Sequence, residues 1–174
     1  MRKNIVMLLA SIVFVIGLLV SYNYISRDGE FTKLSHVTLA LENFQNSVPY
    51  YLGYRFKWEG IGNPSIDKIE FLKKDGTIVT KNDVDLSIQP FIATSTSIGG
   101  LTEELVIKDG LLDELIEVNG FQVDDNFTLV VRVELVDVSN FNNDISSLRI
   151  TYKKYGMTQT QSIPFDGGFV TDLD

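Results

Sequence analysis

The chain has 174 residues, with 15 basic and 23 acidic side chains and a formal net charge of −8. Its 44% hydrophobic and 22% charged residues are typical of a globular protein and not of a disordered one. The acidic balance argues against nucleic-acid binding, because phosphates repel such a surface. The absence of cysteine excludes disulfides, thiolate metal sites and a cysteine nucleophile.

The N-terminal segment has the pattern of a membrane-spanning helix. Arg2 and Lys3 precede a run from Asn4 to Ser26 that contains no charged side chain. As a helix, the part from Ile5 to Ile25 would span about 31 Å, close to the ~30 Å hydrocarbon core of a bilayer. We therefore predict that residues 1–26 form an uncleaved signal-anchor, which is a single transmembrane helix.

A cleaved signal peptide is the alternative for this segment, and it requires small residues at the third and first positions before the cut. Cleavage after Ser26 would place Tyr24 at the third position, and cleavage after Ser21 would place Leu19 there. Neither site suits a signal peptidase, so the sequence favours the uncleaved anchor.

The charges that flank the anchor predict its orientation. Arg2 and Lys3 lie before it, whereas Arg27 on the other side is accompanied by Asp28 and Glu30. Because positive flanks stay in the cytoplasm, we expect a cytoplasmic N-terminus and an extracytoplasmic domain at the cell membrane. That domain, residues 27–174, carries 13 basic and 23 acidic side chains, a net charge of −10. A chain of this length buries roughly 68–70% of its unfolded surface, enough for one self-sufficient core.

Hydrophobic alternation with a period of two dominates residues 27–174. In the segment 51–59, for example, Leu52, Tyr54, Phe56 and Trp58 share one face, which indicates a half-buried strand. The segments predicted as strands are 51–59, 66–72, 77–79, 86–92, 127–135, 148–153 and 158–163.

Three details refine this pattern. Lys73 to Gly76 predicts a hairpin turn, and Pro90 predicts an edge position or a bend in its strand. Residues 34–44 fit both a strand and a helix, and the β-rich context favours a strand. Residues 110–118 fit a two-turn helix, which would be the one helix outside the anchor.

Short strands separated by turns predict a mainly β fold. We expect a two-sheet antiparallel β-sandwich after the transmembrane helix, with the immunoglobulin-like arrangement as the most common of that type. Trp58 in an early strand is compatible with such a core, although no cysteine pair accompanies it. This fold hosts many functions and therefore implies none.

The candidate residues for chemistry are few. His36 is the single histidine and has no second histidine or thiolate to share a metal with, so we expect an ordinary side chain. Several carboxylates would suit an acid/base pair of a glycoside hydrolase, but in an acidic protein they are more typical of a solvated face. These are Glu103, Glu104, Asp113, Glu114, Glu117, Asp124 and Asp125.

Calcium is a further candidate ligand, since loops of surface β domains bind it through oxygen atoms. The best candidate loop contains Asn140, Asn142, Asn143 and Asp144, but it lacks the glycine and glutamate of an EF-hand, and the pair Asp83 and Asp85 is no better. We therefore expect local loop chemistry there.

Tyr51 is the one aromatic residue of its strand that points away from Trp58, so it is a candidate for a surface binding site. The other aromatic residues of this strand are expected to pack in the core.

We therefore predict a membrane-anchored cell-surface binding or assembly module without catalytic activity. We expect no catalytic, cofactor-binding or metal-binding residue and no cofactor. The expected partners are the membrane, through the N-terminal helix, and a protein with a basic or neutral surface, but no nucleic acid. The alternative is a small exported hydrolase that uses surface carboxylates.

Overall fold

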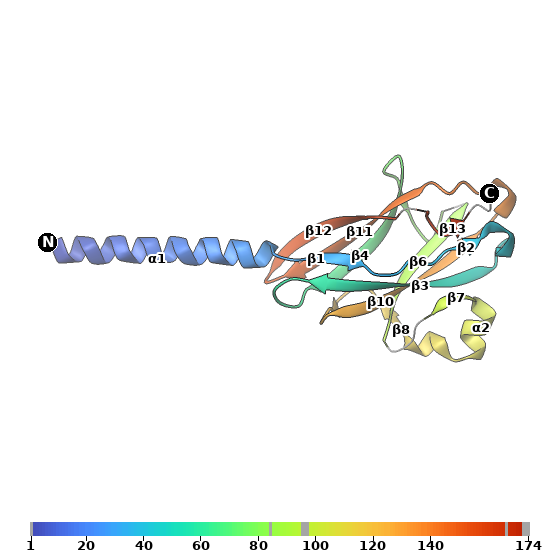
Figure 1. Cartoon of the computed structure of the whole chain (residues 1–174), viewed down its shortest axis with the longest axis horizontal. Helices are drawn as coiled ribbons and strands as arrows, with labels where there is room; N and C mark the ends of the chain where they lie inside the picture. The colour runs from blue at the N-terminus through green and yellow to red at the C-terminus, as the bar shows by residue number, and fades with distance from the viewer. Residues whose placement is uncertain (1, 84, 95–97, 166, 172–174) are drawn as a thin grey trace.

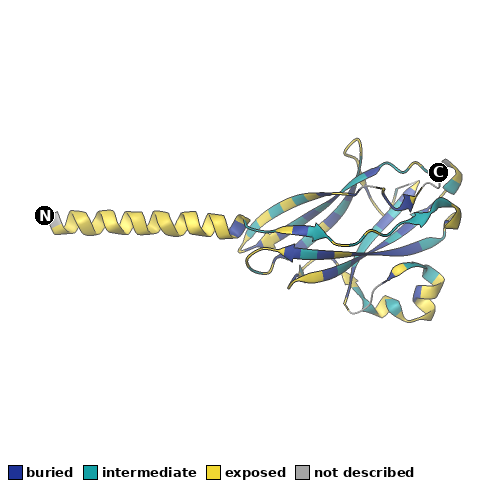
Figure 2. Cartoon of the chain, in the orientation of Figure 1, coloured by how far each residue is buried: buried dark blue, intermediate teal, exposed yellow. Residues whose placement is uncertain are grey.

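The computed structural model describes residues 2–83, 85–94, 98–165 and 167–171. A long helix, α1 (Arg2–Arg27), projects from one end of a β-rich body (Figure 1). The helix is exposed along almost its whole length (Figure 2). It ends just before Gly29, whose φ of +100° is a conformation that other residues rarely adopt.

The first sheet of the body is antiparallel and contains the longest strand, β3. Its strand order is β1-β3-β10-β6-β8, and β7 pairs with the part of β3 that β1 leaves open. The strands are β1 (Glu30–Lys33), β3 (Pro49–Glu59), β6 (Leu86–Ala93), β7 (Gly99–Thr102), β8 (Leu115–Glu117) and β10 (Asn126–Leu135).

The second sheet is also antiparallel, with the order β12-β11-β4-β5 and with β9 beside the other end of β4. Its strands are β4 (Ser65–Lys73), β5 (Ile78–Val79), β9 (Phe121–Gln122), β11 (Ile145–Lys154) and β12 (Met157–Pro164). A small parallel pair, β2 (Leu39–Ala40) with β13 (Val170–Thr171), lies at the end of the body away from α1 (Figure 1).

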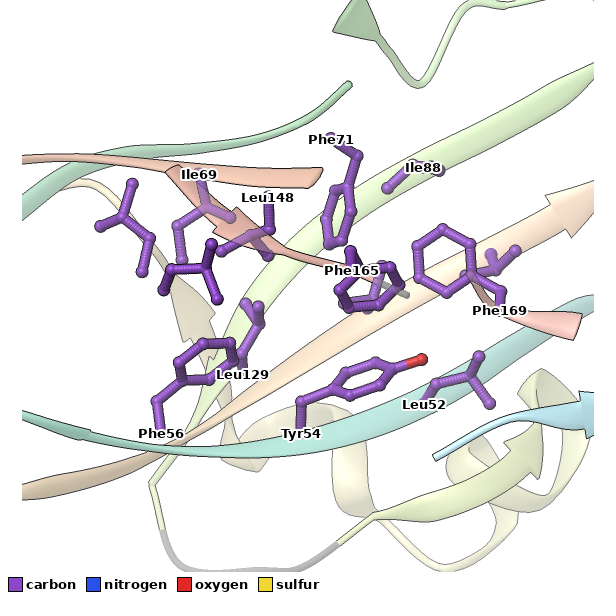
Figure 3. Close-up of a cluster of buried hydrophobic side chains, with 14 of the residues drawn as sticks. Leu52, Tyr54, Phe56, Ile69, Phe71, Ile88, Leu129, Leu148, Phe165 and Phe169 are labelled. Carbon is purple, nitrogen blue, oxygen red and sulfur yellow. The ribbon is translucent and has the colours of Figure 1, made fainter. Parts of the chain in front are cut away.

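The inner faces of the two sheets share one hydrophobic core. Phe56 from the first sheet and Phe71 from the second are almost completely buried, and Leu129 and Leu148 lie between the layers (Figure 3). Tyr54 is buried among them, but its hydroxyl donates a hydrogen bond of 2.7 Å to the carbonyl of Val37. The period-two alternation of the strands therefore reflects burial against the opposite sheet.

A second, smaller hydrophobic cluster covers part of the outer face of the first sheet. The short helix α2 (Glu103–Lys108) and a 3-10 turn (Leu111–Glu114) place Val106 over Tyr51 and Val130. As a result, the middle of β10 is buried on both faces.

The structure confirms a mainly β chain with an N-terminal long apolar helix and antiparallel sheets. Each segment predicted as a strand contains one, and the turn after Lys73 leads into β5 as expected. Pro90 lies in β6 immediately before the three residues that pair with β8, so its missing N–H faces an unpaired side of the strand.

Two local predictions were wrong. Residues 34–44 form only the two-residue β2 and a 3-10 turn, because side chains hold this segment in place of a ladder: the Ser35 hydroxyl accepts the N–H of Arg55. Residues 110–118 are not an α-helix. Gly110 at φ +71° ends α2 instead, and Leu115–Glu117 pairs with β6 as β8.

Candidate binding site at an open sheet edge

The edges of the two sheets meet along β1 and β12. Gln161 of β12 joins them through its side-chain amide, which accepts the N–H of Phe31 at 2.6 Å and donates to the carbonyl of Phe31 at 2.8 Å. The Gln161 amide thus occupies the position of a neighbouring strand for one residue of β1. These two hydrogen bonds satisfy the outward backbone N–H and C=O of Phe31, but they leave the backbone of β12 without a partner strand on this side.

The outward backbone groups of β12 follow from the geometry of its hairpin. Tyr155 and Gly156 both have positive φ, 50° and 79°, which is the type I′ conformation of a two-residue loop. Such a loop closes with a hydrogen bond between its flanking residues, Lys154 and Met157, so odd-numbered residues of β12 point their backbone groups to β11.

The even-numbered residues Thr158, Thr160 and Ser162 therefore direct their N–H and C=O groups away from the sheet. Within the described residues, no hydrogen-bond partner faces these groups. We call these backbone groups the open edge.

The open edge lacks the usual protection against pairing with another chain. Native edges are commonly short, charged, bulged or interrupted by proline. The other outer strands are shorter, because β5, β8 and β9 have two or three residues and β1 and β7 have four. The part of β6 that β8 leaves unpaired contains Pro90. By contrast, β12 has eight residues with the sequence MTQTQSIP, in which no side chain is charged and the only proline is the last residue.

A groove runs beside the open edge. It has a volume of about 380 Å³ and is lined by the four residues of β1 and by Gln161 to Pro164 of β12. Its apolar lining residues include Phe31 and Ile163, which are themselves buried, while Glu30 and Lys33 supply charges of both signs. A strand added to β12 would place alternate side chains in this groove and the others on the outer face beside Thr158 and Thr160.

The carboxylates singled out from the sequence are not gathered into a metal site. Among the described residues no group of three or more histidine and acidic side chains is placed to hold a metal ion. Asp124 accepts a hydrogen bond from Asn63, Asp125 accepts one from Asn126, and His36 is exposed.

Glu103 belongs to a charged network on the outer face of the first sheet. Its carboxylate accepts the Nε–H of Arg132 at 2.9 Å and the hydroxyl of Tyr51 at 3.2 Å, and Arg132 also pairs with Glu134 at 3.0 Å. The hydrogen bond from Arg132 lowers the pKa of Glu103. A general acid needs the opposite shift, so this arrangement is that of a structural ion pair.

Tyr51 is not a surface residue, contrary to the expectation from its strand face. Only 3% of it is exposed, because α2 covers it, and burial raises the pKa of its hydroxyl. Hydrophobic alternation in β3 did not indicate that α2 packs over the outer face of the first sheet.

The side chains of the loop considered for calcium bond to other segments of the chain. The amide nitrogen of Asn143 donates to the carbonyls of Gly167 and Val170, and Asp144 lies 3.6 Å from the ammonium of Lys73. One oxygen of Asn143 and one of Asp144 are buried without a hydrogen-bond partner in the described chain. Two oxygens are far fewer than the six to eight ligands of calcium. The side chain of Asn140 lies outside the described residues.

The open edge was missed from the sequence, although a signal for it is present. In a central strand the inward positions are apolar, but β12 has Gln159 and Gln161 at two of its inward positions. This is typical of a strand whose inner face is only half covered.

The N-terminal helix is long and apolar enough to span a membrane. No protein-family model, curated protein or solved structure shows a significant match to this chain.

Proposed function

We propose that this protein is a membrane-anchored cell-surface binding or assembly module, without catalytic activity, that pairs an extended segment of a partner protein with β12. The observation that carries the proposal is the open edge, which lies on an uncharged eight-residue strand and has three outward N–H groups with no hydrogen-bond partner within the described chain. Strand addition at an exposed edge is a common mode of peptide recognition, in which backbone hydrogen bonds supply the affinity and alternate side chains supply the specificity.

We further propose an immunoglobulin-like β-sandwich for residues 27–174. The strand order β1-β3-β10-β6 facing β12-β11-β4-β5 supports this assignment, because it corresponds to the order A-B-E-D facing G-F-C with an added strand beside C. The chain also changes sheets between β3 and β4 and again between β10 and β11, as that topology requires.

For the anchor, we propose that residues 1–26 remain attached and that the N-terminus is cytoplasmic. The supporting features are the exposed apolar helix and the positive residues Arg2 and Lys3 before it. The β domain then stands outside the cell membrane, where β12 is accessible to extracellular segments or to other surface proteins.

The partner is expected to carry a basic or neutral segment. The proposed ectodomain has a net charge of −10, counting 13 basic and 23 acidic side chains, and repels acidic partners and nucleic acid over about a Debye length, ~8 Å at physiological salt. Association with a basic segment should slow as salt rises, because the attraction is screened.

The test uses the full chain in lipid nanodiscs and a phage-displayed library of random linear peptides as the probe. We expect the selected peptides to bind the wild-type chain and to lose at least about tenfold in affinity with Thr160→Pro, which removes one outward N–H and blocks the adjacent pairing. Thr160→Val is the matched control, because it changes the side chain but keeps the N–H.

The outcome that contradicts the proposal is equally specific. If selected peptides bind Thr160→Pro and wild type with equal affinity, recognition occurs elsewhere on the molecule. Unchanged circular dichroism of Thr160→Pro distinguishes a lost edge from a lost fold.

A further inference from the structure

The end of α1 is bonded to the tip of the β11–β12 hairpin. The hydroxyl of Tyr22 donates to the carbonyl of Tyr155 at 2.6 Å, and the side-chain amide of Gln159 donates to the carbonyl of Ser26. The ammonium of Lys154 donates to the carbonyl of Asp28. The helix therefore does not join the body through a free linker, and the hairpin tip is held beside its last turns (Figure 1).

The loop between β3 and β4 completes this joint. Asp28 accepts the backbone N–H of Ile61 at 2.9 Å, and the indole N–H of Trp58 donates to the carbonyl of Gly62 at 2.7 Å. The Lys154 ammonium lies 5.2 Å from the Trp58 ring centre. A Cβ at Gly62 would collide with the phenol of Tyr155, so the loop and the hairpin tip lie against each other.

The helix fixes how far this joint lies from the bilayer. If the hydrocarbon core ends at Val20, the backbone of Tyr22 is about 3 Å beyond it, and if the core extends to Ile25, Tyr22 is about 4.5 Å inside it. The polar headgroup layer is roughly 5–7 Å thick on each side. Since Tyr155 is hydrogen-bonded to Tyr22, the first limit places the hairpin tip in the headgroup layer, and the second places it at the edge of the hydrocarbon core.

The exposed side chains of this end suit that environment. Tyr155 is 49% exposed and Ile61 is 51% exposed. The carbonyl of Tyr155 accepts the hydroxyl of Tyr22, and the N–H of Ile61 donates to Asp28, just after the helix. Tyr22 and Tyr24 of the helix are exposed as well. Tyrosine is enriched where a membrane meets water, because its ring is apolar and its hydroxyl is polar. Tyr155 also occupies a left-handed position that asparagine or glycine usually takes in such turns, so the sequence retains a bulky aromatic residue where the backbone disfavours it.

We infer that the β11–β12 hairpin tip and the β3–β4 loop form a membrane-seating surface, with Tyr155 and Ile61 in the headgroup layer of the outer leaflet. The β domain stands directly on the bilayer, and β12 rises from the membrane surface. The partner of this surface is lipid, and zwitterionic lipid suffices, because the contact is aromatic and apolar while the domain is net negative. The inference rests on the anchor part of the proposed function and is independent of the open edge.

The single tryptophan makes the seat measurable, because Trp58 lies within the joint. The full chain is reconstituted into phosphatidylcholine vesicles that contain lipid with a quencher on the headgroup or, separately, deep in the acyl chains. We expect strong quenching of Trp58 by the headgroup label and weak quenching by the deep label.

Two variants make the test decisive. A six-residue Gly/Ser spacer between Arg27 and Asp28 adds up to ~20 Å of reach and should abolish most of the headgroup quenching. The double variant Tyr155→Asn with Ile61→Ser, which keeps a favoured turn residue, should also lose most of it while circular dichroism stays unchanged.

The outcomes separate the seat from the anchor. If alkaline carbonate releases the full chain from the vesicles, both the anchor and the seat are wrong. If the chain resists extraction but wild type and the spacer variant are quenched equally, the anchor stands and the seat is wrong.

Discussion

Strands β10 and β12 have similar lengths, but β10 lies in the middle of its sheet and β12 at the edge of its own. In β10 every inward position is apolar, and the middle of the strand is buried on both faces between β3 and β6. In β12 two inward positions are glutamine, and one side of the backbone pairs with no strand of the described chain. Alternation makes both segments strands, and the chemistry of the inward side chains decides which is central and which is open.

The largest expected effect comes from the core that β10 helps to form. Phe56 is fully buried and stacks on Phe127 with ring centres 5.5 Å apart. Phe56→Ala should lower the free energy of unfolding by about 3–5 kcal/mol, and Val131→Ala by about 2 kcal/mol, because both leave cavities. Denaturant unfolding of the reconstituted full chain measures this. A loss below about 0.5 kcal/mol would place either residue outside the core.

A smaller effect is expected where β12 meets β1. Gln161→Ala removes both hydrogen bonds to Phe31 and should lower stability by about 1–2 kcal/mol, with faster exchange of the Phe31 amide hydrogen. Ser162→Ala is the matched control, because that side chain is exposed on the neighbouring position. Equal exchange at Phe31 in both variants would show that Gln161 does not hold the two edges together.

The ion pair of Glu103 and Arg132 should contribute less, and in a pH-dependent way. Because the folded state lowers the pKa of Glu103 below its usual value of 4.5, the contribution is present above that value and is lost as pH falls through the folded pKa. The pair is partly exposed, so wild type should exceed Glu103→Gln by only about 0.5–1 kcal/mol at pH 7. The difference should vanish in acid. A difference that persists unchanged below pH ~3 would contradict a charge-based origin.

The smallest effect on stability is expected at the open edge. Thr160→Pro removes an N–H that bonds to nothing in the described chain, so unfolding should change by less than about 1 kcal/mol. Pro at Gln161, whose N–H points to β11, should be far more damaging because it breaks the ladder. If the two prolines destabilise the chain equally, the alternation assigned to β12 is wrong.

The sequence predicted the strands well because hydrophobic alternation shows which residues of a strand face the opposite sheet. It failed where a side chain replaces a ladder bond, as the Ser35 hydroxyl does in accepting the backbone N–H of Arg55, and where a second layer covers a face, as α2 does over Tyr51. The open edge could not be located from the sequence, because edge position depends on the order of strands in a sheet and not on local pattern. The glutamines of β12 show that some of this information was present, since they mark an inner face that is only half covered.

The most direct test of the open edge is amide hydrogen exchange in the full chain in nanodiscs, read residue by residue along β12. The backbone N–H groups of Gln159, Gln161 and Ile163 point to β11 and should be protected, while those of Thr158, Thr160 and Ser162 should exchange rapidly. Addition of a peptide selected on the wild-type chain should then slow exchange at these three residues. Uniform protection along β12 in the free protein, or no change at Thr158, Thr160 and Ser162 when the peptide is bound, would contradict strand addition at this edge.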